Sequence, residues 1–242
     1  MKKLKLTAIL ALSVGVFTSC EKNNTLNELN PENQIEEIYT VNNFTEVEIG
    51  SAFEVVVIPG NEFRITANGD EKDIDDLNVR VTNNRLKVNY LNGNIFDNVR
   101  RNRVKILIET PALDAIEVSG AANVDIEKFI YFPEFTAEVT GASKLNLDVK
   151  LGELVTEIRG ASTLTLYQET PFITADLAGA SKLDANDAYS EEVHLELSGA
   201  SQVNVTVSKY LKVNASGASN VIYDGTPRID HDLSGASSVK KK

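Results

Sequence analysis

The chain has 242 residues, which is enough for one large domain or two smaller ones, and its formal net charge is −11. This balance argues against nucleic-acid binding, which needs Lys and Arg gathered on one face. Aromatic residues make up 7% of the chain and Trp is absent, so the sequence supplies little for an aromatic core or for stacking on bases.

Residues 1–19 have the composition of a secretory signal, with a basic start and an apolar run over residues 6–17. That run is too short to cross a bilayer as a helix. The sequence Phe17-Thr18-Ser19-Cys20 resembles the lipobox of bacterial lipoproteins, in which the cysteine becomes the acylated first residue; an ordinary cleavable signal is the alternative. Because Cys20 is the only cysteine, we expect lipidation there and no disulfide, cysteine nucleophile or thiolate metal site in the mature chain.

Residues 20–37 are rich in Asn and Glu and carry little apolar surface to offset the entropy of ordering. We therefore expect a flexible tether. Order should begin near Ile38, and residues 38–242 should form a single β-solenoid domain. Within it we expect N-terminal strands and a cap over 38–110 and regular repeats over 111–242.

The predicted cap contains several alternating strands. Apolar residues alternate around Gly50-Ser51-Ala52, which resembles a degenerate form of the later repeat corner. The acidic stretch over 70–77 can form one helical turn, and it lacks the spacing of a calcium loop, so we interpret it as a solvated surface turn. A β-hairpin is predicted from strands at 79–81 and 86–90.

The only dense basic cluster of the mature chain lies at Arg100-Arg101-Asn102-Arg103. Three arginines in a loop can bind an anionic sugar or a phosphate head group. Such a run is more often a solvated loop, and both interpretations stay open.

A Gly-Ala-Ser tripeptide recurs through the rest of the chain, with a Gly-Ala-Ala variant at its first station. Its glycines advance by 21, 19, 19, 20, 18 and 18 residues, and each is followed by an alternating strand such as Lys144-Leu145-Asn146-Leu147. A near-constant period of this length predicts stacked coils of a parallel β-helix. The glycines are Gly120, Gly141, Gly160, Gly179, Gly199, Gly217 and Gly235.

Each residue of the tripeptide has an expected role. Gly provides a positive φ or a close backbone approach, and Ala points into a crowded corner. Ser hydrogen-bonds at the bend and to its equivalents above and below. Antiparallel hairpins in a sandwich or barrel are the alternative geometry. The serines of the expected column are Ser143, Ser162, Ser181, Ser201, Ser219 and Ser237.

The sequence gives weak support to catalysis. A serine nucleophile needs a base, and only His194 and His231 exist, neither in a Gly-x-Ser-x-Gly setting. Acid/base chemistry on a polysaccharide could use paired carboxylates, either Asp184 with Asp187 or Asp230 with Asp232. The charges are scattered through the loops, so we expect no enzyme, no cofactor and no metal site. The last strand ends in three lysines, a common protection against edge-to-edge aggregation.

From Phe44 to Val239 the chain resembles the autotransporter adhesin head GIN domain family. The resemblance is carried by the segments 44–49, 52–57, Pro59-Gly60 and the Gly-Ala-Ser stations. It implies an all-β fold, a right-handed parallel β-helix of about 19-residue coils, and no established reaction. We expect a non-catalytic, lipid-anchored protein in the envelope of a diderm bacterium, with the outer membrane as its expected site. Its partners would be the membrane, through the lipid, and a glycan or another surface protein; a purely structural envelope role is the alternative.

Overall fold

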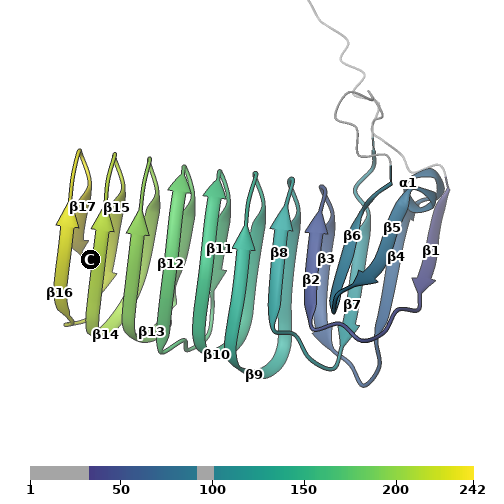
Figure 1. Ribbon diagram of the computed structural model, residues 1–242, viewed down its shortest axis with the longest axis horizontal. Helices are drawn as coiled ribbons and strands as arrows, with labels where there is room; N and C mark the ends of the chain where they lie inside the picture. The colour runs from purple at the N-terminus through teal and green to yellow at the C-terminus, as the bar shows by residue number, and fades with distance from the viewer. Residues whose placement is uncertain (1–32, 92–100) are drawn as a thin grey trace, which may run out of the picture. The chain divides into compact units, whose positions relative to one another are not determined.

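The computed structural model describes residues 33–91 and 101–242, and most of these residues lie in β-strands. Successive strands stack side by side as the coils of a β-solenoid (Figure 1). Among these residues the one helix, α1 (Glu71–Asp75), is far too short to span a membrane. The strands are β1 (Gln34–Tyr39), β2 (Glu46–Gly50), β3 (Glu54–Pro59), β4 (Arg64–Asp70), β5 (Leu77–Thr82), β6 (Arg85–Tyr90), β7 (Lys105–Thr110), β8 (Ala115–Ser119), β9 (Asn123–Val139), β10 (Lys144–Gly160), β11 (Thr163–Leu166), β12 (Phe172–Gly179), β13 (Lys182–Leu197), β14 (Gln202–Ala215), β15 (Asn220–Asp224), β16 (Arg228–Leu233) and β17 (Ser238–Lys241).

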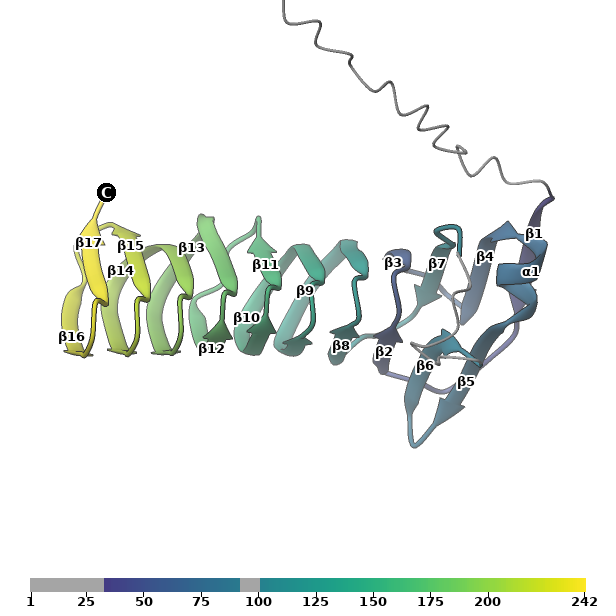
Figure 2. The ribbon, with the colours of Figure 1, turned by 90° about the horizontal axis from the view of Figure 1, so that it is seen from above.

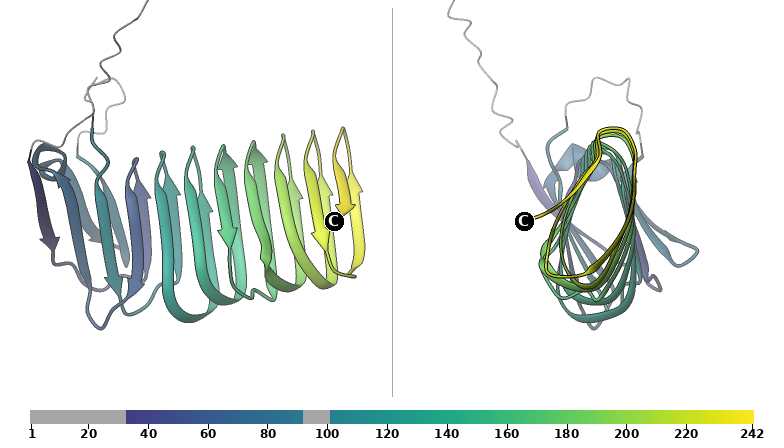
Figure 3. Two further views of the ribbon diagram at one scale, coloured as in Figure 1. Left: turned by 180° about the vertical axis from the view of Figure 1, so that it is seen from behind. Right: turned by 90° about the vertical axis from the view of Figure 1, so that its left-hand side faces the viewer.

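The coils run parallel to one another and keep a nearly fixed register. β10 pairs in parallel with β9 on one side and with β11 and β12 on the other, and the same pattern continues to β16 and β17. The solenoid has about seven turns of about 19 residues, as the spacing of the glycines predicts. The antiparallel alternative is therefore wrong for the repeats. Viewed along the stack, the coils superpose as one flattened oval (Figure 3).

The core is a set of aliphatic columns inside this oval. Side chains alternate between the interior and solvent along each strand, so one interior position recurs in every coil. Burying one such side chain contributes about 2 kcal/mol to the stability of the folded state. Each coil covers the side chains of its neighbours, so the coils stabilise one another. One column consists of Val124, Leu145, Leu164, Leu183, Val203 and Val221, all at most 1% exposed.

The N-terminal end departs from the parallel pattern. β4 pairs antiparallel with β1 and β7, and β5 forms the predicted hairpin with β6. Asn83 and Asn84 have positive φ in the turn of that hairpin. Seen from above, β5 and β6 diverge from the stack, while α1 lies beside β1 and β4 (Figure 2). The regular coils thus begin beneath a mixed cap.

The predicted start of the ordered domain lies four residues too late. β1 begins at Gln34, and its pairing with β4 joins Gln34 to Asp70. Residues 34–37 therefore belong to the folded domain and not to the tether. β1 is an outer strand with mostly exposed side chains, so its composition is polar. Its partner β4 lies far away in sequence, so the pairing could not be predicted from the local composition.

Candidate functional site

The repeated glycines occupy the corners as predicted. All seven have φ between +70° and +86°, a conformation that residues with a side chain rarely adopt. The next coil lies directly against each corner, because a Cβ built on Gly160 would lie 2.5 Å from the carbonyl oxygen of Gly141. These glycines are therefore structural.

The orientations of Ala and Ser in the corner correct our expectation. Ala142 and its equivalents are exposed, whereas Ser143, Ser162, Ser181, Ser201 and Ser219 are at most 1% exposed. The serine column thus lies inside the coil. Within the column the amide of Ser143 donates a hydrogen bond to Oγ of Ser162 at 3.3 Å, and Oγ of Ser181 is hydrogen-bonded to Oγ of Ser201 at 3.3 Å. A substrate in solution cannot reach these five hydroxyls, so the column stabilises the fold.

The first corner is displaced by one residue from the predicted alignment. Gly50 is the last residue of β2 and pairs with Ser119, so Ser51 takes the place that glycine holds in later coils. Phe53, which is fully buried, then takes the place of the inward serine. Its carbonyl oxygen accepts a hydrogen bond from the amide of Asn123 in the next coil, just as the carbonyl oxygen of Ala122 accepts one from the amide of Lys144. The first corner therefore exists, but its residues equivalent to Gly-Ala-Ser are Ser51-Ala52-Phe53 and not Gly50-Ser51-Ala52.

The paired aspartates of the catalytic alternative lie in ordinary outward positions. Asp184 borders a shallow hollow with Asp187; burial opposes its ionisation, but the hydrogen bond and charge of Lys182 hold the pKa of Asp184 below its usual value. A carboxylate with a lowered pKa is a poor general acid. Asp230 accepts a hydrogen bond from the hydroxyl of Tyr210 at 3.3 Å, and Asp232 is exposed two residues further on. No general acid emerges from this geometry.

Arg101 has a structural role that neither interpretation of the basic cluster anticipated. Its guanidinium lies 3.9 Å from the centre of the Tyr90 ring and contacts the carboxylates of Asp76 and Asp73. Asp73 is 1% exposed, whereas Glu71 and Asp75 are exposed, so the acidic turn is solvated only in part and the prediction fails at Asp73. Arg100 lies outside the described residues. The cluster therefore contributes an internal ion pair to the cap.

A hollow lies at the second bend of the coil that begins at Gly120, where β9 turns. Between Glu127 and Tyr131 the strand β9 contains three residues where β10 has only Val149, so two extra residues form a bulge. Lys128 in this bulge has a φ of 70°, which is unusual for a residue with a side chain. Strained residues and bulges gather at functional sites, so this bend is a candidate.

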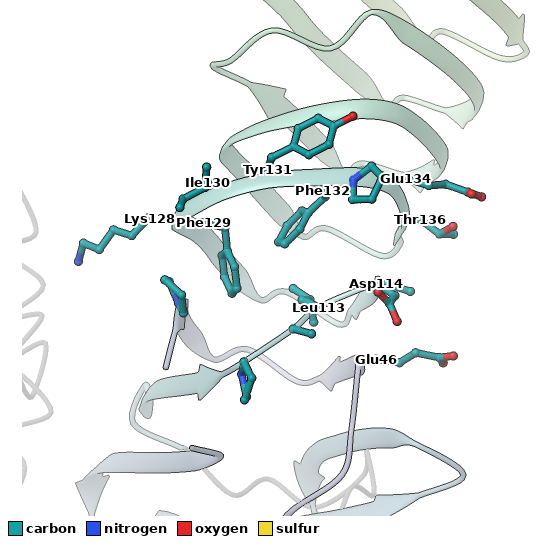
Figure 4. A pocket seen from close by; sticks show the side chains of 15 residues that line it. Glu46, Leu113, Asp114, Lys128, Phe129, Ile130, Tyr131, Phe132, Glu134 and Thr136 are labelled. Atoms are coloured by element: carbon teal, nitrogen blue, oxygen red, sulfur yellow. The ribbon is translucent and has the colours of Figure 1, made fainter. Parts of the chain in front are cut away.

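The hollow has a volume of about 880 Å³ and is lined mainly by apolar side chains. Phe129 and Phe132 point into it across Leu113, with their ring centres 4.8 Å apart (Figure 4). Ile130 is 91% exposed and Tyr131 is 54% exposed beside it. A large exposed apolar side chain at the edge of a hollow of this size is typical of a binding site. The other lining residues are Glu46, Pro59, Pro111, Ala112, Asp114, Ala115, Lys128, Pro133, Glu134 and Thr136.

A close backbone approach holds the bulge in place. A Cβ on Gly152, in the next coil, would lie 2.3 Å from the carbonyl oxygen of Pro133 and 2.5 Å from the hydroxyl of Tyr131. Only glycine lets β10 pass this close to the bend. The shape of the hollow therefore depends on both coils.

A column of carboxylates runs along the solenoid from the strands that border the hollow. Its members occupy the same outward position in successive coils, about 4.8 Å apart. Arg85 lies 3.0 Å from Glu117 and Arg159 contacts Glu157, but in the described part of the chain no cation forms an ion pair with Glu138. We call this the acidic column: Glu48, Glu117, Glu138, Glu157, Asp176, Glu196 and Asp232, with Asn214 between the last two.

Electrostatic crowding within the acidic column is evident at Glu117. Burial and the negative charges of Glu48 and Glu138 raise the pKa of Glu117, against the opposing effect of Arg85 and Lys87. The column thus places carboxylates in a row along one face, with Arg85, Lys87 and Arg159 paired to some of them. Over residues 33–91 and 101–242, no three metal-binding side chains converge to form a metal site.

The family described as "Putative auto-transporter adhesin, head GIN domain" matches residues 43–227. The chain belongs to this family. No curated protein matches its sequence.

Solved structures share the head GIN domain fold. A "putative adhesin" from Bacteroides fragilis NCTC 9343 has a TM-score of 0.78 at 19% identity, covering 87% of this chain and 98% of its own. Another from Parabacteroides merdae ATCC 43184 has a TM-score of 0.71 at 15% identity, with 87% and 97% covered. A "Putative lipid binding protein" from Parabacteroides distasonis ATCC 8503 reaches 0.68 at 19% identity, again with 87% and 97% covered. At these identities the likeness shows the fold alone.

Sequence reasoning missed both the hollow and the acidic column. The spacing of 21 residues between Gly120 and Gly141 was the signal for extra residues in that coil. An acidic residue also stands three places before most of the repeated glycines, as at Glu138 and Glu157. Cys20, the predicted lipidation site, lies outside the described residues.

Proposed function

We propose that this head GIN domain protein is a non-catalytic adhesin of the cell envelope, anchored in the membrane by a lipid on Cys20. We propose further that it binds its partner through the hollow beneath Phe129 and Phe132. Membership of the family supports an adhesin-like role, and the lipobox-like sequence before Cys20 supports the anchor. The outer membrane of a diderm bacterium is the proposed site.

One observation carries the binding proposal. Ile130 projects into solvent at 91% exposure, beside an open hollow that is lined by apolar side chains. Exposing such a side chain confers no stability on the isolated protein, whereas burying it against a partner contributes about 2 kcal/mol. The bulge that presents Ile130 interrupts the register between β9 and β10, which supports a role in recognition, although β13 also carries extra residues between Ala185 and Tyr189.

The binding proposal is tested on cells that display the full chain. Ile130→Ser should reduce attachment to host or bacterial surfaces without reducing the amount displayed, because a 91% exposed side chain adds little to folding. Tyr189→Ser is the matched control, since Tyr189 is also exposed but does not line the hollow. Equal attachment by wild type and Ile130→Ser would reject the hollow as the adhesive site.

The anchor is tested separately. Cys20→Ala should move the protein from the membrane fraction to the soluble fraction, because acyl chains supply about 0.8 kcal/mol of membrane affinity per buried methylene. Protease treatment of intact cells then shows whether the domain faces the outside. Unchanged membrane association of the variant would refute the lipid anchor.

A further inference from the structure

We infer that the partner of the hollow is a cationic amphipathic peptide segment, with an apolar side chain in the hollow and Lys or Arg side chains along the acidic column. This inference rests on the proposed function, because it names the partner of the same site. Three observations carry it: the apolar lining, the charges at the rim and the position of the acidic column.

The rim of the hollow is asymmetric in charge. Glu46, Asp114 and Glu134 lie on one side, and Lys128 lies on the opposite side (Figure 4). Lys128 is already paired with Glu127 at 2.8 Å, and Glu46 is paired with Arg85. No ion pair joins Asp114 or Glu134 to a cation within the described ranges. The carboxylate side is therefore the side that can accept a cationic group.

The carboxylate side of the hollow continues directly into the acidic column. Glu46, Ala115 and Thr136 line the hollow from β2, β8 and β9, and they pair with one another across the coils. Two residues further along the same strands stand Glu48, Glu117 and Glu138, on the same outward face because side chains alternate with a period of two. An apolar side chain in the hollow thus places the next residues of its chain, about 7 Å away, over the first carboxylates of the column.

The acidic column lacks enough cations of its own. Six carboxylates, from Glu48 to Glu196, recur at about 4.8 Å, a distance at which like charges repel appreciably even in water. Arg85 and Lys87 serve the first coils, and Arg159 serves Glu157 with Asp176. Glu138, between these groups, has no ion pair within 4.0 Å in the described chain, although the charge of Arg159 also acts on it. A cationic partner would reduce this repulsion between carboxylates, and the reduction would add to the free energy of binding.

Other occupants fit less well. An anionic membrane or a nucleic acid would be repelled by the acidic column. An acyl chain would use the apolar lining but not the carboxylates. A neutral glycan could pack on the aromatic side chains of the hollow, but it has no positive charge to pair with the carboxylates. A peptide that is apolar at one end and basic beyond it uses both features.

The test uses purified full-length protein and a short fluorescent peptide in which a Phe-Ile-Leu end is followed by lysines. Two comparison peptides replace either the lysines with Gln or the apolar end with Ser. In fluorescence anisotropy we expect binding of the first peptide alone, with affinity falling as salt rises. Ile130→Ser should weaken binding roughly tenfold, and Glu138→Gln should weaken it at low salt and flatten the salt dependence. Glu54→Gln, on the opposite face, should leave binding unchanged.

Equal binding of the Gln peptide, or binding insensitive to salt, would overturn the inference, and so would binding of neutral lipid vesicles in preference to the peptide. These outcomes differ from failure of the proposed function. If attachment of cells depends on Ile130 but the protein binds none of the three peptides, only the proposed identity of the partner is wrong. If attachment does not depend on Ile130, the adhesive site itself is wrong.

Discussion

The amide nitrogen of Ala161 donates to the carbonyl oxygen of Gly141, one coil away, at 2.8 Å. The same bond recurs at every later Gly-Ala-Ser station, at 2.7 or 2.8 Å. It joins the corners into one hydrogen-bonded column. The geometry leaves no room for a Cβ on the glycine, so the column makes a direct prediction.

Gly160→Ala should destabilise the protein strongly. The new Cβ would lie 2.5 Å from the carbonyl oxygen of Gly141, and φ at Gly160 is +77°. Backbone strain and overpacking each cost about 1 to 3 kcal/mol, so the free energy of unfolding should fall by roughly 2 to 6 kcal/mol in urea denaturation. Ala161→Ser, at the exposed neighbouring position, is the control and should change stability by less than about 0.5 kcal/mol. Equal stability of the two variants would contradict the column.

The coil architecture could be predicted from the sequence because its corners demand glycine, and after Gly120 the only glycines outside the corners are Gly152 and Gly225. The inward orientation of Ser143 could also be predicted from the sequence, because Ser143 stands two residues before the apolar Leu145 and side chains two residues apart point to the same face of a strand. The small size of Ala misled the assignment, because size alone does not decide which side of a strand a residue occupies. The alternating pattern was the better guide.

Other features depended on partners distant in sequence. β1 lies beside β4, some thirty residues away, and its polar composition carries no sign of that pairing. Arg101 contacts Asp76 and Tyr90 through a fold that brings α1 and β6 to one place. The acidic column becomes visible only when the coils are aligned on their glycines, which places Glu138 beside Glu157. Register is a property of the stack and not of any one strand.

Two serines of the inner column should respond differently to substitution by Ala. Oγ of Ser201 donates to the carbonyl oxygen of Ser198 at 2.9 Å, whereas Oγ of Ser143 has no hydrogen-bond partner among the residues described. Ser201→Ala should cost about 1 kcal/mol, and Ser143→Ala should be neutral or stabilise by up to about 1 kcal/mol. The buried Ala122 shows that alanine fits this position. Midpoints of urea unfolding would measure both, and a larger loss at Ser143 would refute this account.

Arg101→Met should open the cap before the repeats. It would leave the carboxylate of Asp73, 1% exposed, without the nearby guanidinium, and losing one partner of a buried pair costs roughly 3 kcal/mol. Hydrogen exchange should accelerate in α1, β5 and β6 while β10 to β14 stay protected, since coils contact only their neighbours. Arg80→Met, on the exposed face of the hairpin, is the control. Uniform acceleration throughout the chain would argue against a separable cap.

Glu117→Gln should stabilise the protein at neutral pH but not in acid. Burial first, and then the charges of Glu48 and Glu138, raise the pKa of Glu117 above its ordinary value of 4.5 in the folded state. The folded state therefore binds the proton more tightly than the unfolded state, so the contribution of Glu117 to stability falls as pH rises through the window above 4.5. The amide removes this loss, and because Glu117 is one-third exposed and also pairs with Arg85, the gain should be only a few tenths of a kcal/mol.

The measurement is urea unfolding of wild type and Glu117→Gln at neutral pH and at a pH well below 4.5, with Glu54→Gln as the control on the opposite face. The difference between wild type and Glu117→Gln should shrink toward zero or change sign in acid, because Glu117 is then protonated in both states and resembles the amide. Loss of the 3.0 Å contact with Arg85 acts in the opposite direction at neutral pH, but Arg85 keeps its contact with Glu46 at 2.8 Å. A stabilisation that grows as the pH is lowered would show that repulsion along the acidic column does not govern this position.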